Sequence, residues 1–305
     1  MRCSRVPAAL LAGSEIQVID EVTRKGPGMG ETGWVIPLLR ACHLQPTVAV
    51  TAIATTLAVS AGRGFGSGWV ALAVLSGQFS VGWSNDYLDR DRDRLAGRAD
   101  KPIVAGRVTA RAVGAAALVA AVLCVPLSMM SGWRAGTIHL AAVAVAWAYN
   151  GWLQSTVASV VPYTLAFAAL PAFVTLGLPG HPWPPVWAIV AAALMGTGAH
   201  FVNTLPDLGG DARTGLRGLT HRVGRGASLA LGALLLASAT VVLAVAPPGR
   251  PGLLGSALVA VALVAVIAVV GAGLTGHLRT AWSLALVVAA LNVAAFVARG
   301  GSLTA

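Results

Sequence analysis

The chain has 305 residues, of which 56% are hydrophobic and only 10% are charged, and its mean hydropathy is +0.77. Soluble domains carry about 25% charged residues, so this composition excludes an ordinary soluble protein and predicts an integral membrane protein. The net charge of +10 therefore indicates orientation in the bilayer and contact with anionic groups, and we expect no nucleic-acid partner.

Residues 1–33 are rich in glycine and charge, and we interpret them as a flexible cytoplasmic tail. Their short apolar piece, residues 6–13, has the minimum length of a signal-peptide core and is followed by acidic residues. Residues 34–305 then form the membrane domain.

This membrane domain contains nine apolar stretches, and a helix needs roughly 20 apolar residues to cross a bilayer. They cover about residues 43–61, 68–85, 112–131, 135–149, 157–178, 186–205, 227–246, 253–273 and 281–298. No soluble domain fits between them. The sequence therefore predicts an all-α integral membrane protein built as a bundle of nine transmembrane helices.

Lysine and arginine define the orientation of this bundle. With the N-terminus in the cytoplasm, seventeen of the 21 fall on the cytoplasmic side, and the other four are Arg63, Arg134, Arg250 and Arg299. Because short cytoplasmic loops carry an excess of these residues, we expect a multi-pass protein of the cell membrane with a cytoplasmic N-terminus. The loops after the second and sixth spans then face the cytosol.

The acidic residues are concentrated in those two loops. Four of the eleven lie in the tail, and the others are Asp86, Asp89, Asp91, Asp93, Asp100, Asp207 and Asp211. On a helix, like charges at i, i+3 and i+7 share one face and repel each other unless cations neutralise them. Carboxylate and amide oxygens suit Mg²⁺, above all Mg²⁺ shared with a phosphorylated substrate.

Both acidic motifs reach the same face of the membrane. If their helices are neighbours, five or six oxygen ligands converge on one cavity, and nearby basic side chains are placed to bind phosphate oxygens. A solvated, self-paired charged surface is the alternative for the first motif alone. Two motifs on one side that hold every acid outside the tail favour a site for a lipid diphosphate.

The motifs resemble the two aspartate-rich sequences of the UbiA superfamily of intramembrane prenyltransferases. The first, Asn-Asp-x-x-Asp-x-x-x-Asp, is met by Asn85, Asp86, Asp89 and Asp93, and the second, Asp-x-x-x-Asp, by Asp207 and Asp211. The similarity covers about residues 40–305, and its further matches are Arg98, Lys101-Pro102, Gly106, Tyr149, Ala169-Leu170-Pro171, Gly215, Thr220 and Gly224.

The resemblance implies that residues 34–305 form a prenyltransferase domain, a nine-helix bundle with an active-site cavity that faces the cytosol. It implies that Mg²⁺ is held by Asn85, Asp86, Asp89, Asp93, Asp207 and Asp211. Of these, Asp89, Asp93, Asp207 and Asp211 are the catalytic residues that help to ionise an allylic prenyl diphosphate. The diphosphate itself would contact Arg98, Lys101 and Tyr149.

One position departs from the resemblance. The family commonly has a lysine a few residues after that tyrosine, whereas residues 149–156 contain no cation. Either another basic residue, Arg222, takes its place, or the diphosphate is bound differently.

Several side chains about one turn into the membrane from the motifs are candidates for the pocket. Aromatic faces there could steady an allyl cation, although interfacial tryptophan is common for other reasons. Those candidates are Phe79, Trp83, Trp147 and Phe201, and Asn203 could orient a carboxylate or an acceptor. His43 is either a proton acceptor near the first motif or an interfacial residue, while we expect His139 and His200 to be hydrogen-bonded core residues.

The function that follows is transfer of a prenyl group from a prenyl diphosphate to a small acceptor, with Mg²⁺. The acceptor is an aromatic ring, a quinone precursor, a sugar phosphate or another prenyl chain. A terpene cyclase of the same fold is the alternative, since it ionises the diphosphate without an acceptor. A transporter would not need seven acids on one side, and Asp211-Ala212-Arg213 lacks the frame of a CDP-alcohol phosphotransferase.

Overall fold

The computed structural model describes residues 33–206, 208, 215–249 and 252–303, and within these ranges all regular structure is helical. The predicted tail lies outside the described residues, apart from Gly33. The α-helices are α2 (Val35–Ala41), α3 (Leu44–Ser60), α4 (Gly66–Leu95), α5 (Ala110–Met129), α6 (Trp133–Gly151), α7 (Val161–Thr175), α8 (Val186–Asn203), α10 (Leu219–Val245), α11 (Leu253–Leu274) and α12 (Leu278–Ala298). Two short 3₁₀ helices, η2 (Leu153–Ser155) and η3 (Val157–Val160), connect α6 to α7, and a third, η5 (Gly300–Leu303), follows α12.

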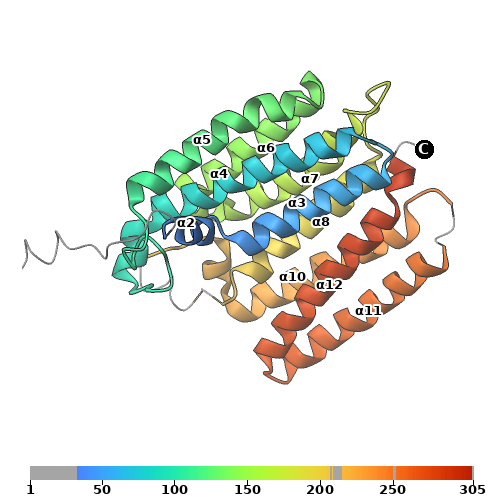
Figure 1. Cartoon of the computed structure of the whole chain (residues 1–305). Helices are drawn as coiled ribbons and strands as arrows, with labels where there is room; N and C mark the ends of the chain where they lie inside the picture. Colours follow the sequence, from blue (N-terminus) through green and yellow to red (C-terminus); the bar gives the residue numbers. More distant parts are fainter. Residues whose placement is uncertain (1–32, 207, 209–214, 250–251, 304–305) are drawn as a thin grey trace, which may run out of the picture.

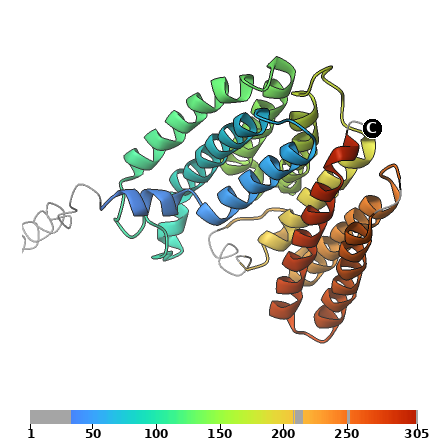
Figure 2. The same cartoon turned by 45° about the vertical axis from the view of Figure 1, so that its right-hand side comes forward.

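The helices run side by side as one bundle, with the α11–α12 hairpin at its edge (Figures 1 and 2). Among the described helices, six are long and apolar enough to cross a membrane, and a bent pair, α2 with α3, makes a possible seventh. This confirms an all-α, multi-pass integral membrane protein. Helices α4 and α6 lie in the same bundle but carry polar residues toward their ends, so the count of nine spans stays a prediction.

The polar end of α4 holds the first acidic motif. The helix has 30 residues and continues past its apolar part through Asn85, Asp86, Asp89 and Asp93 to Leu95. It ends in a Schellman arrangement, in which the amide of Gly97 bonds the carbonyl of Arg94 and the amide of Arg98 bonds the carbonyl of Asp93. Gly97 has φ +69°, and this reversal turns the following residues back toward the end of α4.

The entry into the bundle is a sharp bend between α2 and α3. The two helices differ in direction by 68°, and His43 at the break has φ +56°, which is uncommon for a residue other than glycine. The bend lies against α4 because Gly82 has no side chain: a Cβ there would come within 2.0 Å of the Cys42 carbonyl oxygen. Trp83 secures the contact by donating from Nε1 to the carbonyl of Leu38 at 2.8 Å. The contact therefore places His43 beside the first motif.

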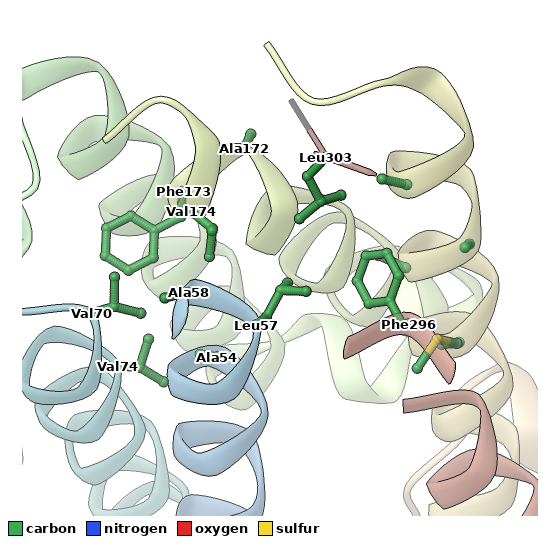
Figure 3. Packing of buried hydrophobic residues seen from close by; sticks show 14 of the residues in the cluster. Ala54, Leu57, Ala58, Val70, Val74, Ala172, Phe173, Val174, Phe296 and Leu303 are labelled. Atoms are coloured by element: carbon green, nitrogen blue, oxygen red, sulfur yellow. The ribbon is translucent and has the colours of Figure 1, made fainter. Parts of the chain in front are cut away.

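The main core joins helices that are distant in sequence. Figure 3 shows Ala54, Leu57 and Ala58 of α3 close to residues of α4 and α7, with Phe296 of α12 and Leu303 of η5 on the other side. The outer surface is apolar as well: α11 exposes Val264 and Ile267, as expected of a helix that faces lipid. Because lipid offers little hydrophobic drive for helix association, small residues and interhelical hydrogen bonds hold such bundles together.

The fit of Gly82 against Cys42 gives a stability prediction. We expect Gly82→Ala to lower the free energy of unfolding by about 3 kcal/mol, because the new methyl group meets a backbone carbonyl that cannot rotate away. Gly68→Ala on the same helix is the control, since its Cβ would meet nothing within 4 Å and replacing glycine in a helix gains up to about 1 kcal/mol. Unfolding in detergent measures both, and equal stability of the two variants would contradict the packing described for α2 and α4.

Candidate active site

The carboxylates of the first motif differ in their surroundings. Asp86 is 1% exposed and Asp93 is 9% exposed, and both are directed toward the segment that follows α4. Asp91 is exposed and pairs with Arg90 and Arg94 of its own helix. Helix α4 therefore buries Asp86 and Asp93, which belong to the predicted metal set, and leaves Asp91, which does not, in solvent.

Lys101 is the counter-charge of the buried pair. Its Nζ lies 3.0 Å from Oδ1 of Asp86 and 3.8 Å from Oδ2 of Asp93. The same Nζ lies 3.1 Å from Nε2 of His43, and because an ammonium group can only donate, that nitrogen accepts the bond. The structure thus brings together one predicted diphosphate ligand, two predicted metal ligands and the histidine of the α2–α3 bend.

Burial and the Lys101 charge have opposite effects on the pKa of the two buried carboxyls. Asp86 and Asp93 lie beyond the apolar part of α4, residues 68–85, and burial raises the pKa of both carboxyls above the ordinary range of aspartate. The Lys101 ammonium opposes that rise in both cases. Oδ2 of Asp86 is buried without a hydrogen-bond partner. A buried carboxylate oxygen with no donor is the kind of atom that a cation would satisfy.

Asp89 faces a different set of neighbours. Its Oδ2 accepts from Nδ2 of Asn85 at 3.1 Å, and its Oδ1 accepts from Nε2 of Gln154 at 3.0 Å. Arg92, one turn along α4, forms an ion pair with Oδ1. Asn85 and Asp89 of the predicted metal set are therefore in direct contact, and a side chain from the α6–α7 connection joins them.

Two amides in this cluster, Asn150 and Gln154, are functional candidates that the sequence analysis missed. Asn150 is buried at the end of α6 and donates from Nδ2 to the carbonyl of Val81 at 2.8 Å and to Oγ of Ser84 at 2.9 Å. Gln154 is 9% exposed. The signal that could have found them is their place in residues 149–156, where two amides stand in the stretch that lacks a cation.

The other candidates for diphosphate contact are spread over three elements. Arg98 forms two hydrogen bonds with Asp100, at 3.1 and 3.2 Å, and these bonds hold the pKa of the Asp100 carboxyl below its ordinary range. Tyr149 packs edge-on against Tyr163 and His200, with ring centroids 5.4 and 6.1 Å away. Arg222 is exposed on α10 and donates from Nε to the carbonyl of Arg217.

The predicted pocket aromatics take part in helix packing. Phe79 stacks on Trp83 with ring centroids 4.9 Å apart, and Trp147 donates from Nε1 to Oγ of Ser80 at 3.2 Å. Phe201 is 4% exposed and packs on the ring of His200. Asn203, the last residue of α8, is exposed. Their role in a pocket stays a prediction.

The two membrane histidines are hydrogen-bonded core residues, as predicted. Nδ1 of His139 lies 2.8 Å from Oγ of Ser128, and its ring stacks on Phe173 with centroids 4.5 Å apart. Nε2 of His200 lies 3.2 Å from Oγ of Ser159 in η3. Both histidines therefore have structural partners on neighbouring elements.

Asp207 and Asp211 of the second motif lie outside the described residues. Among the residues that the structure does describe, no three His, Cys, Asp or Glu side chains form a group that could hold a metal ion. Helix α10, which follows the second motif, begins at the α6–α7 connection: the amide of Leu219 donates to Oγ of Ser159 in η3 at 3.0 Å. The metal-binding role of Asn85, Asp86, Asp89 and Asp93, and the convergence of both motifs, stay predictions.

The described chain is thus a multi-pass helical bundle that gathers aspartate, asparagine and lysine side chains at the polar end of one helix. The chain matches the UbiA prenyltransferase family over residues 45–274. Since the match covers more than half of the chain, the protein belongs to this family of transferases, as the resemblance predicted. Among curated proteins, no sequence match was found.

Solved structures share this fold. A structure of digeranylgeranylglyceryl phosphate synthase has a TM-score of 0.66 and 16% identity, over 88% of this chain and 99% of that one. A UbiA homologue from Archaeoglobus fulgidus bound to DMAPP and Mg²⁺ has a TM-score of 0.60 and 18% identity, over 85% and 98% of the two chains. A UbiA homologue from Archaeoglobus fulgidus bound to GPP and Mg²⁺ has a TM-score of 0.57 and 18% identity, over 86% of this chain and 99% of that one.

The pairing of Lys101 with Asp86 gives a second stability prediction. We expect Lys101→Met, measured with a chelator present, to lower the free energy of unfolding by about 3 kcal/mol, because it leaves a buried carboxylate without its counter-charge. Asp100→Asn is the control, since it removes an exposed partner of Arg98 and costs at most about 1 kcal/mol. Adding Asp86→Asn to Lys101→Met should restore part of the loss, and an additive loss would contradict the ion pair.

Proposed function

We propose that the protein transfers a prenyl group from an allylic prenyl diphosphate to a small acceptor, in a Mg²⁺-dependent reaction at the cytoplasmic face of the cell membrane. The observation that carries the proposal is the cluster at the polar end of α4. There, buried Asp86 and Asp93 lie around Lys101, and Asp89 lies between Asn85 and Gln154. Membership of the UbiA family and the bound DMAPP, GPP and Mg²⁺ of the similar structures support it.

The donor set suits the metal. Mg²⁺ prefers oxygen ligands and is usually bound by one or two carboxylates together with substrate phosphates. In our proposal these ligands come from Asn85, Asp86, Asp89, Asp93, Asp207 and Asp211. When bound, Mg²⁺ would neutralise the negative charge that develops on the leaving diphosphate.

The protein's own side chains bind and orient the donor. Lys101, with Arg98 nearby, supplies positive charge for the diphosphate oxygens, and a charge-assisted bond of this kind is stronger than a neutral one. The apolar part of α4 and its neighbours would surround the prenyl chain. The carbon–oxygen bond of the donor breaks with its electron pair on the diphosphate, a carbon or oxygen atom of the acceptor bonds to the allylic carbon, and that acceptor atom's group loses a proton.

The arrangement in the membrane is part of the same proposal. We place residues 34–305 in one prenyltransferase domain of nine spans, in which α4 and α6 also cross the bilayer and the cavity opens to the cytosol. The distribution of lysine and arginine, seventeen against four, supports a cytoplasmic N-terminus and, with it, a cytoplasmic position for the polar end of α4. Residues 1–33 would be the cytoplasmic tail.

Release of pyrophosphate from prenyl diphosphates tests the function. With purified protein, Mg²⁺ and a panel of donors and acceptors, we expect Asp89→Ala to reduce the rate about 100-fold, because loss of a metal ligand costs roughly 3 kcal/mol of transition-state stabilisation. The matched control is Asp91→Asn, which changes an exposed acid two residues along the same helix and should keep most of the activity.

The organic product then identifies the reaction. A prenylated aromatic ring, quinone precursor, sugar phosphate or prenyl chain indicates a transferase and names its acceptor class. A cyclic hydrocarbon or alcohol formed without an acceptor would identify a terpene cyclase instead. The metal site would be refuted if donor binding survived the loss of both Asp89 and Mg²⁺.

A further inference from the structure

Gln154 reaches the first acidic motif from outside α4. It lies in η2, between α6 and α7, and is almost fully buried. Its Nε2 donates to Oδ1 of Asp89 at 3.0 Å and to the backbone carbonyl of Asn150 at 2.9 Å. Both protons of the amide are therefore used, and one of them is directed at a carboxylate that the proposed function assigns to the metal.

The position of this amide is fixed by a second one. Asn150 is anchored to α4 through the carbonyl of Val81 and the hydroxyl of Ser84, and its Oδ1 lies 3.4 Å from Nδ2 of Asn85. Asn85 in turn donates to Oδ2 of Asp89. Each oxygen of Asp89 thus receives an amide proton, and each amide is held by other contacts. A carboxylate bound in this way has little freedom to rotate.

The backbone of the same connection holds the start of α10. A Cβ on Gly218 would come within 2.5 Å of the Gln154 carbonyl oxygen, so the two segments are in close contact. Nearby, Oγ of Ser159 accepts from the amide of Leu219. Gln154 is therefore supported on one side by α6 and on the other by α10, which limits the movement of its side chain.

The neutrality of the group matters for a metal ligand. Oδ1 of Asp89 already pairs with the Arg92 guanidinium of the same helix, and a lysine or arginine at position 154 would add a second positive charge that competes with a metal ion. An amide donates a hydrogen bond and adds no charge. Partners that hydrogen-bond a ligating carboxylate orient it, and their loss typically weakens metal binding 10- to 100-fold.

We propose that Gln154 is a positioning residue that fixes the orientation of the Asp89 carboxylate for cation binding. It acts through Asp89 and does not touch the donor. This inference rests on the proposed function, in which Asp89 is a metal ligand. It also accounts for the absence of a cation from residues 149–156: the position is used to orient an acid, and diphosphate binding is left to Lys101 and its neighbours.

Equilibrium binding of dimethylallyl diphosphate as a function of Mg²⁺ concentration tests the inference without measuring turnover. Gln154→Met keeps the size of the side chain and removes the donor. We expect it to raise the Mg²⁺ concentration for half-maximal binding about tenfold. Donor affinity at saturating Mg²⁺ should stay within about twofold, because Gln154 does not contact the diphosphate.

Ser155→Ala is the matched control, since Ser155 is exposed in the same 3₁₀ helix and its hydroxyl donates to the carbonyl of Trp152, within η2's own turn. Its Mg²⁺ dependence should equal that of the wild type. Gln154→Asn keeps an amide but withdraws it by one methylene group. It should also raise the Mg²⁺ concentration for half-maximal binding. This second variant keeps the test available if Gln154→Met does not fold.

The outcomes separate the two proposals. If the wild type binds the donor only with Mg²⁺ and both Gln154 variants need the same Mg²⁺ concentration as the wild type, the positioning role is overturned and the proposed function stands. Equal weakening at limiting and at saturating Mg²⁺ would also overturn it, since that indicates a general structural effect. If the wild type shows no Mg²⁺-dependent binding of any prenyl diphosphate, both proposals fail.

Discussion

The ion pair between Lys101 and the buried acids of α4 is the interaction on which the site depends. Asp86 is 1% exposed, and a carboxylate at that depth is unfavourable unless a positive charge is close. Lys101 supplies that charge only because the Schellman end of α4 reverses the chain within a few residues. The local backbone geometry of a helix end thus decides whether the buried acids are tolerated at the polar end of α4.

Close packing at Gly82 extends this arrangement to the N-terminal side. Because α4 has no side chain at that position, the bend between α2 and α3 lies directly on it, and His43 reaches the Lys101 ammonium. His43 adopts a left-handed backbone conformation there. A left-handed conformation of a residue other than glycine persists where the surrounding contacts hold it in place, and such positions are common beside functional sites.

The amides of Asn85, Asn150 and Gln154 complete the site on its other side. They connect α4 to the end of α6 and to η2, and all their partners are backbone carbonyls or other polar side chains. In a low-dielectric setting an unpaired amide is costly, so these hydrogen bonds favour one fixed orientation of the Asp89 carboxylate. A fixed orientation of this kind would suit the metal role proposed for Asp89.

The sequence alone determined the class of protein, the approximate helices and the first motif, because bilayer crossing demands long apolar stretches and a cluster of acids stands out against them. The resemblance of the two aspartate-rich motifs to those of a known superfamily also led to the correct family. Only the tertiary structure decided which acids are buried, that Lys101 pairs with Asp86 and Asp93, and that Gln154 contacts Asp89. These contacts join residues up to 65 positions apart, and their geometry depends on how helices pack, which no local pattern in the sequence encodes.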